Sequence, residues 1–310
     1  MNLSVIVDQI SSFTTVFLGI FIEAAPFLLL GTVASGLVEV FVSKEEMARL
    51  FPRRAVLATF AGAVMGFAFP VCECGVVPLT RRLFKKGLPV SAGVAFLLAA
   101  PILNPVVLAS TFAAYGFGTV LLARLGMGLI VALGVGLVFA LNDRPMRMLQ
   151  PQAFAPISGG SGEVAVTVAP ARPVRERLRA AMRIAGDEFF EMGRYLVIGS
   201  LLAALMQTVV PQSALLALGS GPVVSVAAMQ LLGYILSVCS TVDAFLSLAF
   251  ASAFTTGSIL GFLVFGPMAD IKSTLMFLGV FRRKYVVYLI VLPFLATMLL
   301  SVFINLNLNW

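Results

Sequence analysis

The sequence predicts an all-α polytopic membrane protein made of two inverted-topology repeats, with about six full crossings and two re-entrant hairpins. Composition is the first observation: of 310 residues, 60% are hydrophobic and 11% charged, whereas soluble domains carry about 25% charged residues. Second, several apolar stretches exceed the roughly 20 residues that a spanning helix needs. Third, a set of motifs recurs about 167 residues further along the chain. The chain is therefore expected to lie in a lipid bilayer.

The basic residues gather in four short stretches, and this pattern orients the chain. Of the 21 Lys and Arg, 18 lie in residues 44–54, 81–86, 144–183 and 282–284. Loops rich in Lys and Arg stay in the cytoplasm, so these stretches are predicted to be cytoplasmic and both termini to be outside. The same loops account for the net charge of +7, so no nucleic-acid partner is expected.

The first repeat, residues 1–141, begins with a crossing predicted at about 12–42. A re-entrant hairpin follows at 53–86 and carries Cys72-Glu73-Cys74-Gly75 at its tip. Only about ten residues, at about 1.5 Å each, separate Cys72 from the next basic stretch, which is too short for a second full crossing.

Two further crossings complete this repeat, at 88–115 and 119–141. The first is predicted to be broken within Ala100-Pro101-Ile102-Leu103-Asn104-Pro105, because prolines remove backbone donors and disrupt helices. Residues 142–183, with five prolines and Gly159-Gly160-Ser161-Gly162, are predicted as a flexible cytoplasmic linker that continues from Val174 as a surface helix. Residues 184–310 form the second repeat.

The repeat rests on unlike residue types that recur at a nearly constant offset. Glu23 and Glu191 are 168 residues apart, Cys72 and Cys239 are 167 apart, and Pro101 and Pro267 are 166 apart. Asn104 corresponds to Asp270 at the same offset as the prolines. An ancient duplication that serves only as a scaffold would give the same pattern.

Charge gives the relative orientation of the repeats. The basic stretches 43–54 and 81–86 align with the uncharged stretches 211–222 and 248–253, and the uncharged 115–119 aligns with the basic 282–284. Loops that are inside in one half are thus outside in the other. Inverted repeats whose broken helices meet at the midplane are typical of transporters.

All three cysteines lie in the two predicted hairpin tips, as Cys72, Cys74 and Cys239. Thiolates select soft metals and thiophilic centres, so the three are candidate substrate ligands for a soft metalloid. Buried cysteines that act only as small hydrophobic residues are the alternative. Thr241 follows Cys239 in the motif Cys239-Ser240-Thr241-Val242-Asp243 and is a further candidate contact.

Four charged residues are candidates for proton or ion coupling: Glu73, Asp243, Asp270 and Lys272. Charges at membrane depth are costly and therefore suggest function. Glu73 and Asp243 flank the cysteines and are predicted to exchange protons, whereas Asp270 and Lys272 are predicted to form an ion pair, whose role is structural or functional.

The predicted helix breaks at Pro101, Pro105 and Pro267 provide the remaining candidates. Asn104, at the first break, is predicted to contact the ligand or to cap a freed backbone end. Glu23 and Glu191 are expected to serve helix packing, gating or substrate contact, with Glu191 paired to Arg194. Arg124 is predicted to extend to the outer interface.

The motifs resemble those of the ArsP-type, or YraQ-like, predicted permease family. The resembling segments are Phe69-Pro70-Val71-Cys72-Glu73-Cys74-Gly75-Val76-Val77-Pro78-Leu79, Ala100-Pro101-Ile102-Leu103-Asn104-Pro105 and Gly266-Pro267-Met268-Ala269-Asp270-Ile271-Lys272. The resemblance covers nearly the whole chain outside the linker. It implies a bacterial inner-membrane permease, and some members export arsenite or trivalent organoarsenicals.

Three functions follow from these observations. The first is a permease that exports a soft thiophilic solute such as arsenite or trivalent organoarsenicals, in exchange for protons. The second is a permease for another small anion or sulfur compound, and the third is a transmembrane thiol–disulfide electron carrier. An enzyme is not expected, no Walker-type nucleotide motif is present, and no cofactor is predicted. The expected partners are a small-molecule or metalloid substrate and lipid, and a homodimer is among the assemblies left open.

Overall fold

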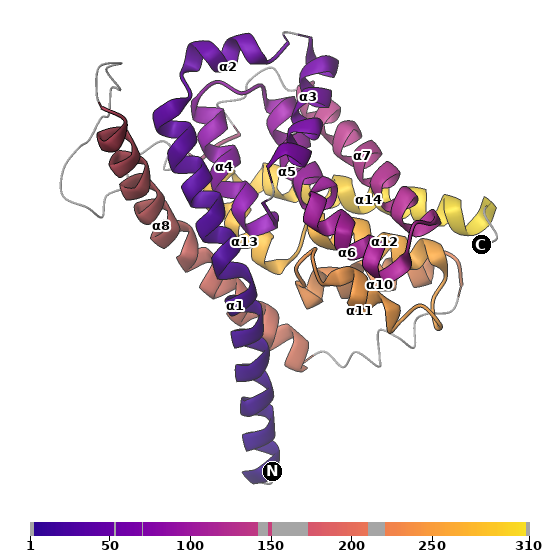
Figure 1. Cartoon of the computed structure of the whole chain (residues 1–310). Coiled ribbons are helices and arrows are strands. Elements are labelled where there is room, and N and C mark those ends of the chain that lie inside the picture. The colour runs from indigo at the N-terminus through magenta and orange to yellow at the C-terminus, as the bar shows by residue number, and fades with distance from the viewer. Residues whose placement is uncertain are drawn as a thin grey trace.

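The computed structural model is an assembly of helices (Figure 1). The structure describes residues 3–52, 54–69, 71–141, 148–150, 173–209 and 221–307. Most of the predicted linker, the predicted outer loop at 211–220, and Arg53 and Pro70 of the first predicted hairpin lie outside these residues.

Six helical segments in the described residues are long and apolar enough to cross a membrane. They are Val7–Phe41, Val90–Tyr115, Thr119–Ala140, Val174–Val209, Thr256–Val280 and Arg283–Asn307. Many of their large apolar side chains are exposed, among them Leu122, Phe190 and Leu299. Lipid is the solvent in which such side chains are stable, so the predicted polytopic membrane protein is confirmed.

The described residues of the first half form seven helices. They are α1 (Leu3–Phe41), α2 (Lys44–Leu50), α3 (Ala55–Ala68), α4 (Glu73–Lys85), α5 (Val90–Leu103), α6 (Pro105–Tyr115) and α7 (Thr119–Ala140). The helix break falls at Asn104, with Pro101 inside the end of α5 and Pro105 at the start of α6.

Outside the membrane spans, α2 begins with a capping box in which hydrogen bonds from Ser43 lower the pKa of Glu46.

The second half has a matching order of described helices. They are α8 (Val174–Val209), α10 (Val224–Leu236), α11 (Asp243–Leu248), α12 (Thr256–Met268), α13 (Ile271–Val280) and α14 (Arg283–Asn307). Pro267 lies in the last turn of α12, as Pro101 does in α5. The repeat itself, its inverted topology, the re-entrant hairpins and the outside termini stay predictions.

The halves are joined by contacts that cross between them. The helices α1 and α8 lie side by side over much of their length (Figure 1). The short helix α4 of the first half packs against α13, and α11 of the second half packs against α6. The helix starts that carry the two cysteine motifs are therefore placed where the halves meet.

A short part of the predicted linker is docked on the second half. Leu149 forms an isolated antiparallel bridge with Phe281, and the backbone N–H of Gln150 donates to the Val280 carbonyl. Met148 and Leu149 are buried. From Val174 the chain is helical, and α8 runs without interruption into the next apolar segment.

Candidate functional site

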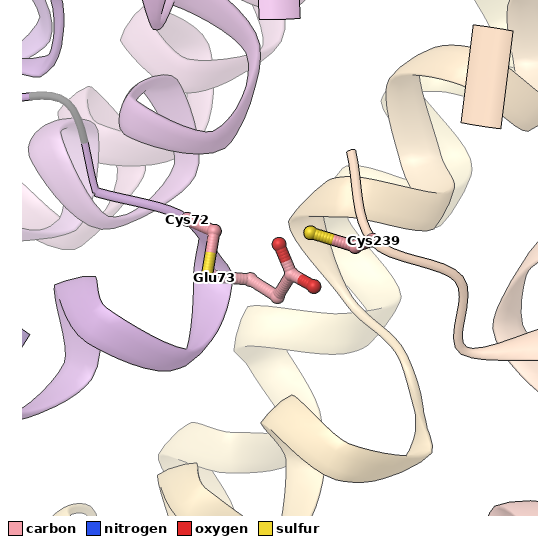
Figure 2. A group of neighbouring side chains, drawn as sticks. All are labelled: Cys72, Glu73 and Cys239. Carbon is pink, nitrogen blue, oxygen red and sulfur yellow. The ribbon is translucent and has the colours of Figure 1, made fainter. Parts of the chain in front are cut away.

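Side chains of both cysteine motifs meet in one buried cluster. One ligand atom from each of Cys72, Glu73 and Cys239 lies within 4.8 Å of the others. All three residues are buried, and the Glu73 carboxylate extends toward the Cys239 sulfur (Figure 2). Cys74 follows in the first turn of α4 and is buried, but it is not a member of the tight cluster. The cluster thus joins the two halves of the chain.

The first motif is positioned by the junction between α3 and α4. Cys72 is the extended N-cap residue of α4, which places its thiol at a helix N-terminus and Glu73 in the first turn. The junction is tied to the α5–α6 break, because the Asn104 side-chain amide donates to the Val71 carbonyl at 3.5 Å while its Oδ1 accepts from the Val106 backbone. Asn104 therefore caps a freed helix end.

The second motif is held in a related way. Ser237 ends α10 in the left-handed conformation, with φ 49° and ψ 41°, which is uncommon for a residue with a side chain. Its hydroxyl accepts from the Ile271 backbone N–H at the start of α13. The backbone carbonyl of Cys239 accepts from the N–H groups of Val242 and Asp243 at 3.0 Å and 3.1 Å. These contacts fix Cys239 opposite Cys72.

Lys272 brings a positive charge to the cluster. Its Nζ lies 3.7 Å from Glu73 Oε1 and 3.5 Å from Asp270 Oδ2. The expected Asp270–Lys272 ion pair is therefore present. Asp270 also caps α13 by accepting from the Ser273 backbone at 2.6 Å. Neither Glu73 carboxylate oxygen accepts a hydrogen bond from the described residues, so this carboxylate is held by charge alone.

Glu23 is a further acid near the cluster whose position sequence reasoning left open. It lies on α1 and interacts electrostatically with Cys239 and Lys272, and its Oε1 has no hydrogen-bond partner among the described residues. The signal for it was the repeat with Glu191. The repeat does not predict that the two acids share an environment, because Glu191 lies away from the cysteine cluster and pairs with Arg81 at 2.8 Å.

Arg124 does not extend to the outer interface, and that prediction is wrong. Its side chain is fully buried and forms a paired contact with Asp243, at 3.0 Å and 2.5 Å, while donating to the Thr111 hydroxyl at 2.7 Å. A guanidinium matches a carboxylate in this two-point geometry. Asp243 is therefore engaged by Arg124, next to the thiol cluster rather than as a free carboxylate within it.

A third network joins α4 to α1 and α8 at the end predicted to be cytoplasmic. The Arg82 guanidinium lies 3.4 Å from Glu188, which also accepts from the Ser35 hydroxyl at 2.5 Å. Glu191 pairs with Arg81 and not with Arg194, the partner that was expected, because α4 brings a basic turn against α8. Among the described residues, Arg194 donates to the Tyr195 hydroxyl and lies over the Tyr195 ring.

The central cluster has the donors to hold a soft cation or metalloid. Two thiols and a carboxylate lie close enough to bind one centre, with Cys74 beside them. Sulfur ligands favour soft, thiophilic species. Lys272 and the N-termini of α4 and α13 add positive potential that favours a negatively charged or thiolate-bound species.

Comparisons with known proteins agree with a membrane transport role. A family described as a predicted permease matches residues 9–306. The chain is 42% identical over 277 residues to "UPF0718 protein YcgR" of Bacillus subtilis (strain 168), covering 89% of this chain and 91% of the relative. It is 34% identical over 281 residues to the "Putative two-component membrane permease complex subunit" of Streptococcus mutans serotype c, covering 87% of each. No solved structure matches the chain significantly. These matches over nearly the full length show that the chain belongs to the ArsP-type predicted permease family.

Proposed function

We propose that this permease moves a soft, thiophilic small solute across the bacterial inner membrane, with arsenite or trivalent organoarsenicals as the leading cargo class. The observation that carries this proposal is the buried meeting of Cys72 and Cys239, from opposite halves, with Glu73 between them. A trivalent centre would exchange its weakly held ligands for the two thiols, each of which releases a proton when it binds.

The location of the cluster supports alternating access. Each half contributes a cysteine that precedes a helix, Cys72 before α4 and Cys239 before α11, and each of these helices packs against a helix of the other half. Movement of one half relative to the other would separate the two thiols and open the cluster to one membrane face at a time. Bound cargo would be released as its two ligands part.

Of the ways to drive transport, exchange of cargo for protons is the one that the residues at the centre of the site support best. Glu73 lies within the cluster, is buried and accepts no hydrogen bond from the described residues. A proton on this carboxylate would compensate for the loss of cargo. Asp243 is a weaker candidate than the sequence indicated, because Arg124 engages both of its oxygens.

Transport by everted membrane vesicles tests the cargo. We expect uptake of a trivalent arsenical driven by a proton gradient, with Cys72→Ser and Cys239→Ser each reducing the rate by at least about tenfold. Cys74→Ser is the matched control within the motif, and a smaller loss is expected because Cys74 lies outside the tight cluster. Normal transport by all three serine variants would exclude a thiol site.

A small anion or sulfur compound is the second candidate cargo, and Lys272 favours it. A buried ammonium beside two helix N-termini would attract an anion without any thiol. This cargo would be transported by the triple serine variant and lost in Lys272→Met. The two variants therefore separate the two cargo classes in one assay.

A second subunit is a proposal that comes from the Streptococcus mutans relative, whose name describes a two-component permease complex. We propose that this chain also acts with a membrane partner. Purified protein reconstituted alone in proteoliposomes would then transport poorly compared with vesicles from the native host. Full transport by the single chain would exclude an obligate partner.

A further inference from the structure

Three residues of the linker between the halves are docked at the corner where α13 meets α14. We call residues 148–150 the strap. Its Leu149 forms an antiparallel bridge with Phe281, and the backbone N–H of Arg282 donates to the Met148 carbonyl at 2.9 Å. The side chains of Met148 and Leu149 are buried. Backbone pairing and apolar burial therefore both hold the strap at this corner.

Gln150 completes the end of α13. The last four carbonyls of a helix lack partners within the helix. The Gln150 side-chain amide donates to the Leu278 carbonyl at 2.6 Å and to the Phe281 carbonyl at 3.3 Å. Its backbone N–H donates to the Val280 carbonyl at 2.9 Å. A residue that precedes Leu278 by 128 positions thus supplies a cap for this helix.

The strap meets α4 of the first half at the same corner. The Phe281 ring lies edge-on to the Phe84 ring near the end of α4, with the two ring centroids 6.1 Å apart. Met148, Leu149, Phe84 and Phe281 belong to one buried apolar cluster. The strap is therefore part of a contact between the two halves, and not only a support for the second half.

The strap and the thiol cluster lie at opposite ends of the same two helices. Helices α4 and α13, one from each half, lie against each other (Figure 1). Cys72 and Lys272 lie at their starts, whereas Phe84 and Phe281 lie at their ends. The ten residues of α13 span about 15 Å. For cargo to reach Cys72 from the side of the strap, α4 and α13 have to separate where Phe84 meets Phe281.

We propose that the strap is a latch that closes the thiol cluster on the side predicted to be cytoplasmic. It holds the end of α13 in the position in which Phe281 packs against Phe84, and so keeps α4 and α13 together. Loss of the Gln150 bonds frees this corner to move away from α4 and makes the cluster accessible from the strap side. The latch is distinct from the ion pairs between α4 and α8, because it joins α4 to α13 through apolar contacts. Its role in transport rests on the proposed function, whereas closure can be measured without cargo.

Labelling of Cys72 by a membrane-impermeant thiol reagent tests the latch, with Cys74 and Cys239 replaced by serine. Gln150→Ala removes the two side-chain bonds at the end of α13 and keeps the backbone pairing. We expect labelling to become about tenfold faster in everted vesicles, as the loss of two hydrogen bonds predicts, and to stay unchanged in right-side-out vesicles. Leu149→Ser, which removes the apolar contact and keeps the backbone bridge, should act in the same direction.

Asn305→Ala is the matched control. The Asn305 amide donates to the Pro222 carbonyl and accepts from the Gly257 backbone N–H, both at 3.0 Å, near the other end of α14. This variant also loses two bonds between a side-chain amide and the backbone, but away from the strap. Its rate of Cys72 labelling should therefore equal that of the parent protein.

The outcomes separate the latch from a general loss of stability. Unchanged labelling in both Gln150→Ala and Leu149→Ser would overturn the latch. Faster labelling in Asn305→Ala as well, or in both orientations of the vesicles, would reveal general loosening and would also overturn it. If the latch variants label faster but the protein with its native cysteines transports no arsenical, the latch stands and only the proposed cargo fails.

Discussion

At the scale of single residues, Lys272 is the cation that compensates the acids of the central cluster. It is buried and lies within ion-pair distance of both Glu73 and Asp270. Removal of one partner from a buried ion pair costs about 3–5 kcal/mol because the other charge stays buried. Lys272→Met should therefore lower the free energy of unfolding by about this amount, measured by thermal unfolding of the detergent-solubilised protein.

Two further variants decide whether the unpaired buried charge causes the loss of stability in Lys272→Met. Lys272→Met combined with Glu73→Gln should recover a large part of the lost stability, because the unpaired carboxylate is then neutral. Lys44→Met is the control, since Lys44 is exposed at the start of α2, and surface substitutions change stability by about 0.5 kcal/mol or less. An equal loss for both lysines would contradict the assignment of Lys272 to a buried ion pair.

Arg124 leads to a second residue-scale prediction. Its planar group makes two contacts with Asp243 and one with Thr111, which a lysine does not reproduce. Arg124→Lys should therefore lower the unfolding temperature clearly, and Arg124→Leu with Asp243→Asn should be more stable than Arg124→Leu alone. A side chain that extended to the interface would tolerate lysine, and that result would contradict the buried pair.

The sequence predicted which residues meet at the candidate site better than it predicted the ion pairs around that site. Cysteines confined to two motifs indicated a thiol site, and the spacing of Asp270 and Lys272 indicated an ion pair. The Arg124–Asp243 pair, the Arg81–Glu191 pair and the position of Glu23 were missed, because each depends on helices packed together from opposite halves. Residue type and spacing carry no information about such distances.

At the scale of helices, the packing of α1 against α4 depends on two glycines in direct contact. A Cβ atom on Gly31 would overlap the Gly75 backbone, and one on Gly75 would lie 2.7 Å from the Phe27 carbonyl. Gly31→Ala should separate the helices and lower the free energy of unfolding by about 1–3 kcal/mol. It should also reduce transport, because α4 carries Cys72 at its start.

Gly19→Ala is the control on the same helix. No atom lies within 4 Å of its Cβ position, so alanine is expected to be neutral or to stabilise by up to about 1 kcal/mol through helix propensity. Unfolding curves of the two variants provide the measurement. If Gly31→Ala were as stable as Gly19→Ala, α1 and α4 would not be in close contact.

The sequence predicted helix boundaries where residues near the boundary determine them. Prolines predicted the break between α5 and α6, and Asn104 was expected there as a cap, which its bond to the Val106 backbone shows. The break falls at Asn104 rather than at Pro101, because a proline in the last turn of a helix removes a donor without ending the helix there. The inverted orientation of the repeats depends on the membrane and stays a prediction.

At the scale of the whole molecule, the three cysteines are enclosed on all sides, so the described conformation is closed to solutes. On the side predicted to be cytoplasmic, the basic end of α4 is held to α8 through Glu188 and Glu191. The helix α4 belongs to the first half and α8 to the second. For cargo to reach Cys72 from this side, these ion pairs have to separate.

Neutralising the two acids of α8 should therefore open this side of the molecule. Glu188→Gln with Glu191→Gln neutralises one acidic partner of Arg82 and one of Arg81, while Arg82 stays 3.5 Å from Glu39. The double change should shift the closed–open equilibrium toward the open state, where a change of about 1.4 kcal/mol corresponds to a tenfold change in population. The readout is labelling of Cys72 by a membrane-impermeant thiol reagent, with Cys74 and Cys239 replaced by serine. We expect labelling to become about tenfold faster in everted vesicles, where the cytoplasmic face is accessible, and to stay unchanged in right-side-out vesicles.

Glu45→Gln, which neutralises an acid in α2, should leave both rates unchanged. Faster labelling in right-side-out vesicles alone would instead place the α4–α8 contact at the outer face and reverse the orientation derived from the basic loops.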